Sequence, residues 1–396
     1  MRHAALRRSC ALAALALLPA CGALLDLPDP NVDPNYGQNT DDSGLLVDGA
    51  YADGFVPPSD GSVTDKDGST GGDGSTTLDA ASACGTHPSC FGGTCMGGVC
   101  APVAVATTNN PSVIAADDTY VYVISGTQLI ERIDPNNGAA STLAPSESEL
   151  ADLKVIGNRI YFSNTGFGNP NKGTVTSCPT AGCGTVRIDY VAGSSVPLFG
   201  VTADTTNVYF TNGSGSGGVY RCPLGTANCS PAAVDTATSA NAYALLLSGG
   251  TLFWDDNSGQ ANGIFQSAAP SGTKFSGGDA TGVVDIAVNS AAVFLTTGST
   301  IDKRVLAGNA KSQIVSGRIN DVAIAVDENY VYWLEATNTR TAGMLERCPL
   351  AFDCTVATDK IETMAHSLDG PADLVVTNDS VYFTTADDGT IWRVAK

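Results

Sequence analysis

Histidine is scarce in this chain of 396 residues, which contains three. Two of them, His87 and His366, lie beyond residue 20. A Ser-His-Asp triad needs a positioned imidazole, and a catalytic zinc centre commonly uses two or three. So few histidines disfavour both kinds of site. We expect His366, within Met364–Ser367, to be a loop residue rather than a catalytic base.

Basic residues are scarce as well, with 20 Lys and Arg against 40 Asp and Glu and a net charge of −20. Loss of residues 1–20, which carry Arg2, Arg7 and Arg8 and no acidic residue, would make this −23. Such a chain repels a phosphate backbone, so nucleic acid is not expected as a partner. The acidity serves solubility, with binding of a cation or a basic partner as the alternative.

Long apolar runs are missing too. The run Ala11–Leu18 follows a start that carries Arg7 and Arg8, and it is far shorter than the ~20 residues of a membrane-spanning helix. A charged start followed by a short apolar run is typical of a signal peptide, which we assign to residues 1–20.

The signal peptide ends in Leu18-Pro19-Ala20-Cys21, which resembles the lipobox of bacterial lipoproteins. The resemblance implies that Cys21 receives lipid and anchors the protein to a membrane of the bacterial cell envelope. Pro19 departs from the usual lipobox residue, and plain secretion with cleavage after Ala20 is the alternative. Gly22, where Asp would signal retention in the inner membrane, favours the outer membrane.

Residues 21–83 form the next region. Between residues 22 and 83 there are twelve Asp, one Lys, ten Gly and no Glu, without strand or helix periodicity. This composition predicts a disordered tether that charge repulsion extends. Asp65–Ser69 briefly resembles a calcium loop, but Gly68 comes too early and no closing Glu follows. We assign no metal there.

Residues 84–101 contain four cysteines, Cys84, Cys90, Cys95 and Cys100. Their spacing lacks the two-residue gaps of zinc knuckles, and in an exported chain it predicts two disulfides. Three pairings are possible. The module resembles short Gly-Cys knots that precede propellers in bacterial lipoproteins, which implies a rigid collar, with recognition as the alternative role.

An apolar-aromatic triplet recurs seven times in the rest of the chain. The triplets are Val121-Tyr122-Val123, Ile160-Tyr161-Phe162, Val208-Tyr209-Phe210, Leu252-Phe253-Trp254, Val293-Phe294-Leu295, Val331-Tyr332-Trp333 and Val381-Tyr382-Phe383. Their central aromatics lie about 38 to 50 residues apart, a period typical of propellers. We predict an all-β, seven-bladed β-propeller of four-stranded antiparallel blades over residues 102–396, with the aromatics packed between neighbouring blades.

The clearest copy is the sixth. Val322–Asp327 reads as an inner strand, Tyr330–Leu334 as the second and Met344–Cys348 as the third. The order of elements resembles the YWTD propellers of low-density-lipoprotein-receptor-type proteins and their bacterial TolB-like relatives. Val331–Leu334 and Val381–Thr385 match best. The Thr-Asp half of the family motif is mostly absent, so no receptor function is carried over.

The chain ends at Lys396, directly after a third strand, which leaves the last blade one strand short. We predict that residues 102–108 supply this strand. Such closure joins the two ends of the propeller in one sheet and removes a free edge.

Six further cysteines form three local pairs, each of which follows a third strand. They are Cys178 with Cys183, Cys222 with Cys229, and Cys348 with Cys354. A Cys-Pro start and four to six intervening residues differ from a thioredoxin-type site, so we predict structural hairpin disulfides. Once Cys10 is removed and Cys21 is lipidated, ten cysteines pair evenly.

Asp117, Asp204 and Asp327 recur after the inner strands. We expect each to accept backbone hydrogen bonds in a tight turn, with a metal-binding rim as in lactonase-like propellers as the alternative. Polar insertions at residues 164–172, 212–218, 255–262 and 336–343 join second to third strands, so they emerge on one face.

Together these features predict a membrane-anchored envelope lipoprotein whose propeller is a binding scaffold for protein, peptide or glycan. We expect a monomer and assign no catalytic residue, metal or cofactor; the binding residues stay unassigned. The alternative is a metal- or quinone-dependent enzyme, of lactonase or dehydrogenase type, with its site in the central channel.

Overall fold

The structure is a computed structural model, and it describes residues 84, 90–96, 98–166, 173–184, 186–213, 218–235, 242–256, 263–268, 271–273, 282–308, 310–318, 320–337 and 341–396. All of these residues belong to one compact unit. The signal peptide, Cys21, the tether and His87 lie outside the described residues.

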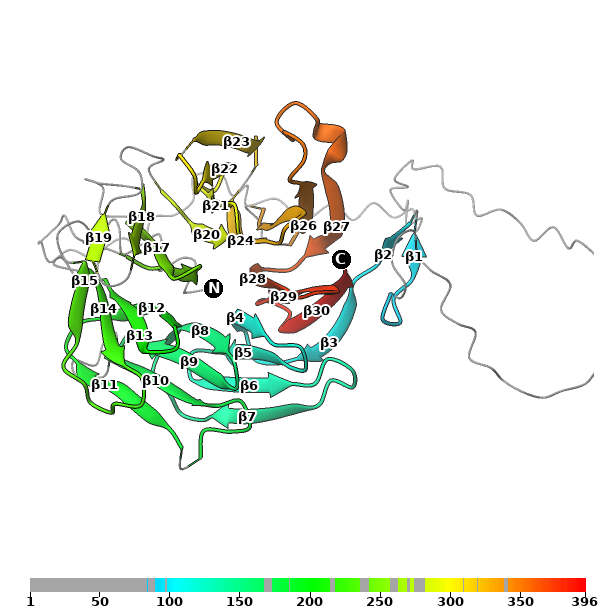
Figure 1. Ribbon diagram of the computed structural model, residues 1–396. Coiled ribbons are helices and arrows are strands. Elements are labelled where there is room, and N and C mark those ends of the chain that lie inside the picture. Colours follow the sequence, from blue (N-terminus) through cyan, green and yellow to red (C-terminus); the bar gives the residue numbers. More distant parts are fainter. Residues whose placement is uncertain are drawn as a thin grey trace, which may run out of the picture. The chain divides into compact units, whose positions relative to one another are not determined.

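The described chain folds into antiparallel strands and one short 3-10 helix, η1 (Thr358–Lys360). Seven four-stranded sheets are found among the described residues (Figure 1). Sheet 1 contains β4 (Pro111–Ala116), β5 (Val121–Ser125), β6 (Leu129–Ile133) and β7 (Ala140–Ala144); sheet 2 contains β8 (Leu150–Ile156), β9 (Arg159–Asn164), β10 (Gly173–Pro179) and β11 (Ile188–Ser194). Sheet 3 contains β12 (Leu198–Ala203), β13 (Asn207–Asn212), β14 (Gly218–Pro223) and β15 (Ala232–Asp235); sheet 4 contains β16 (Leu245–Ser248), β17 (Thr251–Asp256), β18 (Gly263–Ala268) and β19 (Ser271–Thr273).

The remaining three sheets follow the same order. Sheet 5 contains β20 (Asp285–Val288), β21 (Ala292–Thr296), β22 (Thr300–Val305) and β23 (Lys311–Ser316); sheet 6 contains β24 (Asp321–Val326), β25 (Tyr330–Glu335), β26 (Gly343–Pro349) and β27 (Glu362–Leu368). Sheet 7 contains β28 (Pro371–Val376), β29 (Ser380–Thr385), β30 (Thr390–Ala395) and, as its outermost strand, β3 (Val103–Thr107).

The innermost strands contact one another in the cyclic order β4, β8, β12, β16, β20, β24, β28 and back to β4. This is the arrangement of a propeller, and Figure 1 shows the sheets around a common centre. The predicted all-β propeller of four-stranded antiparallel blades is confirmed. No described segment forms a helix of the length and hydropathy needed to cross a membrane.

The core is divided among the seams between successive sheets. Each seam holds the central aromatic of one triplet together with apolar residues of the next sheet; these aromatics are Tyr122, Tyr161, Tyr209, Phe253, Phe294, Tyr332 and Tyr382. All seven are at most 4% exposed. The predicted packing between blades is confirmed, and it explains the triplets, since one large ring per sheet fills each wedge-shaped seam.

The first strand of the propeller, β3, completes sheet 7. β3 pairs antiparallel with β30, with Val103 opposite Arg393 and Thr107 opposite Thr390. This confirms the predicted pairing for residues 103–107. Gly389 lets the two segments meet, because it has a φ of +73° and a Cβ there would collide with the Thr108 carbonyl oxygen.

The small cysteine module precedes β3. Its strands β1 (Cys95–Met96) and β2 (Val99–Cys100) form a hairpin, and its disulfides join Cys84 to Cys95 and Cys90 to Cys100. The structure thereby selects one of the three possible pairings. Cys84, Cys90 and Cys100 pack against Ala395 of β30, so the module contacts the closing sheet.

The three predicted hairpin disulfides are confirmed at Cys178–Cys183, Cys222–Cys229 and Cys348–Cys354. In each case the first cysteine lies in the third strand rather than after it. The bond therefore fastens the end of that strand to the turn that follows.

Candidate functional site

The three recurring aspartates are part of the turns that join first to second strands. Asp117 Oδ1 accepts the backbone N–H groups of Thr119 and Tyr120 at 2.8 and 2.7 Å, and its Oδ2 accepts the hydroxyl of Tyr122 at 2.7 Å. Asp204 and Asp327 do the same for Tyr209 and Tyr332. The tight-turn interpretation is confirmed.

The pKa values of the aspartates and tyrosines in these pairs disfavour acid-base chemistry near neutral pH. Burial by itself raises the pKa of Asp204, but hydrogen bonds from Tyr209 and from the turn amides lower it overall. Burial raises the pKa of Tyr122, and the neighbouring Asp117 raises it further. Asp204 therefore stays ionised and Tyr122 stays neutral, so the pairs act as fixed hydrogen bonds.

A second set of aspartates, which sequence reasoning missed, joins neighbouring sheets. Asp152, Asp285 and Asp373 precede an apolar residue of an innermost strand. Each accepts the N–H of that residue and, through its second oxygen, an N–H of the next innermost strand, that of Val201, Ile324 or Ile114 respectively. The available signal was an Asp-Leu or Asp-Ile pair inside an apolar strand.

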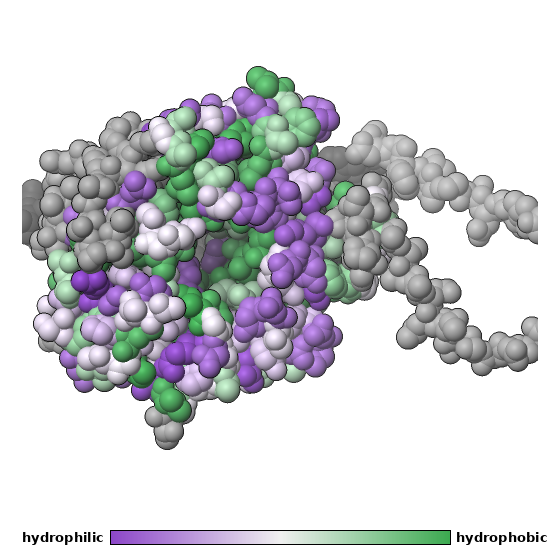
Figure 2. All heavy atoms as spheres, viewed as in Figure 1, coloured by the Kyte–Doolittle hydropathy of each residue, from purple (hydrophilic) through white to green (hydrophobic). Residues whose placement is uncertain are grey.

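Lys154 follows in β8, and its ammonium donates to Asp152 Oδ1 at 3.0 Å. Burial by itself lowers the pKa of Lys154, but the charges of Asp152, Asp373 and Asp285 and the hydrogen bond raise it overall. Asp373 and Asp285 belong to the innermost strands of sheets 7 and 5, so charges from three sheets act on Lys154. Figure 2 shows a hollow near the middle of this face of the molecule. A protonated Lys154 is neither a nucleophile nor a general base at neutral pH.

Metal ligation was the premise of the alternative enzyme function. Among the described residues, the one group that brings three potential ligand atoms within 4.8 Å of one another is Cys84, Cys90 and Cys100. These sulfurs belong to disulfides. The carboxylates of Asp152, Asp285 and Asp373 accept backbone N–H groups of the innermost strands.

His366 lies in strand β27 and not in a loop, so that expectation was wrong. Leu345 pairs with Ala365 and Gly343 with Leu368, which leaves His366 and Ser367 in a bulge. The side chain is exposed, and its Nδ1 lies 3.1 Å from Ser367 Oγ. The bulge, with Ser367 at a φ of +57°, carries the imidazole to the surface.

The predicted polar insertions do join second to third strands, at β9–β10, β13–β14, β17–β18 and β25–β26. All four contain residues outside the described part of the chain. Their shared position in the strand order puts both ends of each insertion on the same face of the ring.

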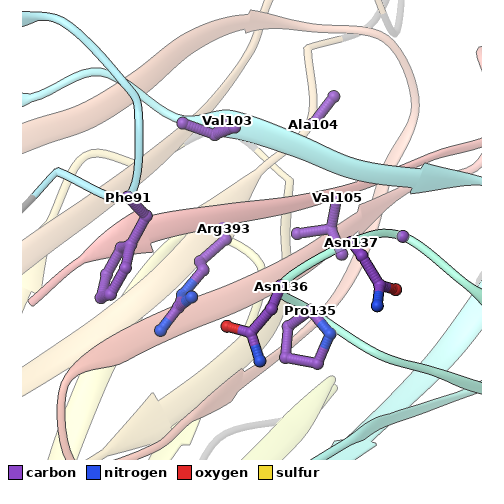
Figure 3. A pocket seen from close by; sticks show the side chains of 9 residues that line it. Phe91, Val103, Ala104, Val105, Pro135, Asn136, Asn137 and Arg393 are labelled. Carbon is purple, nitrogen blue, oxygen red and sulfur yellow. The ribbon is translucent and has the colours of Figure 1, made fainter. Parts of the chain in front are cut away.

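A cavity of about 350 Å³ lies beside β3, away from these insertions. Its walls are the cysteine module, the closing strand and the turn between β6 and β7. The lining residues are Phe91, Val103, Ala104, Val105, Pro135, Asn136, Asn137, Gly138 and Arg393 (Figure 3). Its lining contains one cation, two side-chain amides and several apolar residues, and it is more polar than apolar.

Arg393 is the charged group of the cavity and is 9% exposed. Its guanidinium carbon lies 3.2 Å from the centre of the Phe91 ring and 5.4 Å from that of Tyr382. Nε donates to Ser380 Oγ at 2.9 Å, and Nη2 reaches Asp379 Oδ2 at 3.4 Å. The guanidinium is thus fixed in position between two rings.

Comparisons with known proteins agree on the fold. No protein-family model and no curated protein matches the sequence. The Neurospora crassa Pan2 WD40 domain aligns with a TM-score of 0.57 at 7% identity over 74% of this chain and 95% of that one. The WD40 propeller domain of Doa1 aligns with a TM-score of 0.53 at 9% identity over 74% and 96%. The computationally designed protein Ika8 aligns with a TM-score of 0.53 at 11% identity over 74% and 99%.

At identities this low, the structural likeness shows a β-propeller fold and gives no information about a ligand. Two of these three solved structures, those of Pan2 and Doa1, are WD40 domains. The predicted YWTD- or TolB-like relationship therefore stays a prediction.

Proposed function

We propose that the protein is a lipid-anchored envelope protein whose propeller is a binding scaffold for a protein, peptide or glycan. In this proposal residues 1–20 are removed, Cys21 carries the lipid, residues 21–83 form the tether, and the seven sheets are the seven blades of one ring over residues 102–396. Two sequence features favour the envelope, the lipobox-like Leu18–Cys21 and the even pairing of ten cysteines. The outer membrane and a YWTD- or TolB-like ancestry are part of the same proposal.

One observation supports a scaffold most directly. The repeated acidic side chains of the ring, such as Asp117 and Asp152, form hydrogen bonds within turns and between sheets. The cavity at Arg393, in contrast, has polar and apolar walls and lies at the edge of one sheet. β-Propellers are commonly interaction scaffolds that use such surface sites.

The anchor is tested by metabolic labelling with a radioactive fatty acid, followed by mass analysis of the N-terminal peptide. We expect label on the wild-type chain and none on the Cys21→Ser variant. A mature chain that begins at Cys21 with a free thiol would contradict anchoring and leave plain secretion.

The scaffold role is tested by affinity capture from envelope extracts with the full-length protein as bait. We expect a small, reproducible set of partners that the same amount of heat-unfolded bait does not retain. Equal recovery on both baits would contradict a binding role for the folded ring.

A further inference from the structure

A cation faces the central aromatic across the second and third strands of most sheets. Arg132 lies opposite Tyr122, Arg221 opposite Tyr209, Lys303 opposite Phe294, Arg347 opposite Tyr332 and Arg393 opposite Tyr382. The fourth strand then places one residue on the other side of each cation. Opposite Arg132, Arg221 and Lys303 this residue is Ser141, Ala232 and Ser312 respectively, so sheet 6 alone among these five sheets has an acid at this register.

In sheet 6 this residue is Glu362, opposite Arg347. Arg347 Nε and Nη2 lie 2.7 and 2.6 Å from Glu362 Oε2. The carboxylate comes from the same hairpin as the guanidinium, so the pair is complete within one continuous segment.

In sheet 7 the same position is occupied by Val103, opposite Arg393. The fourth strand here comes from the start of the propeller and carries no acid at this register. Arg393 retains Ser380 Oγ and the distant Oδ2 of Asp379, whose side chain is 65% exposed. Val103 and Arg393 both line the cavity.

The shape of this space indicates what would fill it. Figure 3 shows the guanidinium of Arg393 between the Phe91 ring and the Asn136 side chain. A fixed guanidinium suits the two oxygens of a carboxylate. Val103, Val105 and Pro135 supply apolar walls for a small side chain.

We propose, on the basis of the scaffold function above, that this cavity binds the C-terminal carboxylate of a peptide whose last residue is small and apolar. Arg393 takes the carboxylate, and the Asn136 side chain donates to the terminal residue. β3 is the outermost strand of its sheet, and in this proposal the preceding peptide backbone lies along its outer edge. Gly138 closely approaches the Val105 carbonyl oxygen, so the pairing is limited to the part of β3 before Val105. With a net charge of −20, the protein disfavours polyanions, and a single carboxylate fits better.

Calorimetric titration of the full-length protein tests this. The probes are acetyl-Ala-Ala-Val as free acid, the same peptide as C-terminal amide, and acetyl-valine. We expect the free acid to bind about tenfold or more tightly than the amide, because a charge-assisted pair is lost. Acetyl-valine should bind about tenfold more weakly than the peptide acid, because it lacks the peptide backbone that would lie along the edge of β3.

Two substitutions locate the site. Val103→Glu places a carboxylate opposite Arg393, as Glu362 is opposite Arg347, and should abolish peptide binding without lowering Tm. Ala232→Glu adds the same charge opposite Arg221 in sheet 3 and should leave binding unchanged. Asn136→Ala, at an exposed position, should weaken binding about threefold to tenfold, as loss of one hydrogen bond does.

Three results would overturn the proposal: equal binding of acid and amide, binding of acetyl-valine as tight as that of the peptide, or equal loss in Val103→Glu and Ala232→Glu. The first rejects carboxylate recognition, the second a peptide ligand, and the third this location. Envelope capture by the Val103→Glu variant separates the two proposals, because partners retained by a variant with no cavity leave the scaffold intact and refute the cavity as its site.

Discussion

Sheets 6 and 7 are neighbours with the same strand order, and they differ in how the chain completes them. Sheet 6 is one continuous segment from β24 to β27, whereas sheet 7 takes its fourth strand, β3, from the other end of the propeller. In sheet 6 every strand is joined to the next within one continuous segment, although the connection between β26 and β27 is long and contains η1. In sheet 7 the last pairing, between β3 and β30, depends on noncovalent contacts.

The difference extends to the polar groups around the central tyrosine. Tyr332 of sheet 6 donates to Asp327, and its opposite Arg347 pairs with Glu362. Tyr382 of sheet 7 has Thr377 at the place of Asp327, and Arg393 faces Val103. The cysteine module compensates in part, since Phe91 covers Arg393 and Cys84 and Cys90 pack against Ala395. Closure by a distant strand thus gives Arg393 no fourth-strand carboxylate of the kind that Arg347 has in Glu362.

The largest expected effect comes from proline in the fourth strand. Ala106 pairs with Ile391 in sheet 7, and Ala365 pairs with Leu345 at the same register in sheet 6. A proline inside a paired strand costs about 3 kcal/mol or more. We expect Ala106→Pro to lower the free energy of unfolding more than Ala365→Pro, because β27 stays tethered at both ends after local disruption and β3 does not.

Urea unfolding gives the two free energies, and hydrogen exchange at β30 reports whether the seam has opened. In Ala106→Pro, β30 amides should exchange much faster than in the wild type, whereas in Ala365→Pro the change should be confined to β26 and β27. Equal exchange at β30 in both variants would show that closure is no weaker than a hairpin.

A smaller effect separates the two tyrosines. Tyr332→Phe removes the donor to Asp327 and should cost about 1 kcal/mol, whereas Tyr382→Phe should cost less because no carboxylate depends on that hydroxyl. Burial raises the pKa of Tyr332, and Asp327 raises it further.

This shift gives the comparison a pH dependence. A tyrosine whose pKa is raised on folding stabilises the protein fully below its unfolded pKa of about 10, and this contribution is lost as pH rises above that value. Between pH 9 and 11 the wild type should therefore lose stability more steeply than Tyr332→Phe, as chemical denaturation at each pH will measure. Parallel curves would mean that the Tyr332–Asp327 pair is not coupled to folding.

The sequence predicts those parts of the fold that depend on neighbours in the chain. The triplets mark the seams because the alternation of apolar and aromatic residues is local, and the hairpin disulfides follow from cysteines at a fixed place in the repeat. The missing strand after Lys396 identified β3 because an open sheet edge needs a partner.

Features that depend on register between distant segments could not be predicted in this way. The cavity is lined by Val103 of β3, Arg393 of β30 and the turn between β6 and β7, which are brought together only by the fold. The bridge from Asp152 to the Val201 amide depends on how two sheets meet. The module cysteines allow three pairings, and spacing alone does not choose one. The recurring Arg of the third strands is visible in the sequence, but the sequence does not show which fourth-strand residue lies opposite each Arg.

The smallest expected effect concerns the carboxylates that lie next to Arg347 and Arg393. Glu362→Gln removes the carboxylate from Arg347, which is 9% exposed, while Asp379→Asn removes the nearest one from Arg393. Because Glu362 is 43% exposed and Asp379 is 65% exposed, solvent screening reduces both effects. We expect about 0.5 to 1 kcal/mol for Glu362→Gln and about 0 to 0.3 kcal/mol for Asp379→Asn, measured by urea unfolding at low and high salt.

The two variants also separate stability from binding. If Asp379 competes weakly for the guanidinium, Asp379→Asn should tighten acetyl-Ala-Ala-Val binding about twofold to fivefold while leaving unfolding almost unchanged. Glu362→Gln should show the reverse, with a change in unfolding and none in binding, because Arg347 does not line the cavity. A loss of stability in Asp379→Asn as large as in Glu362→Gln would show that Arg393 is already satisfied within the protein, and the difference between the two sheets would then lie in chain connectivity alone.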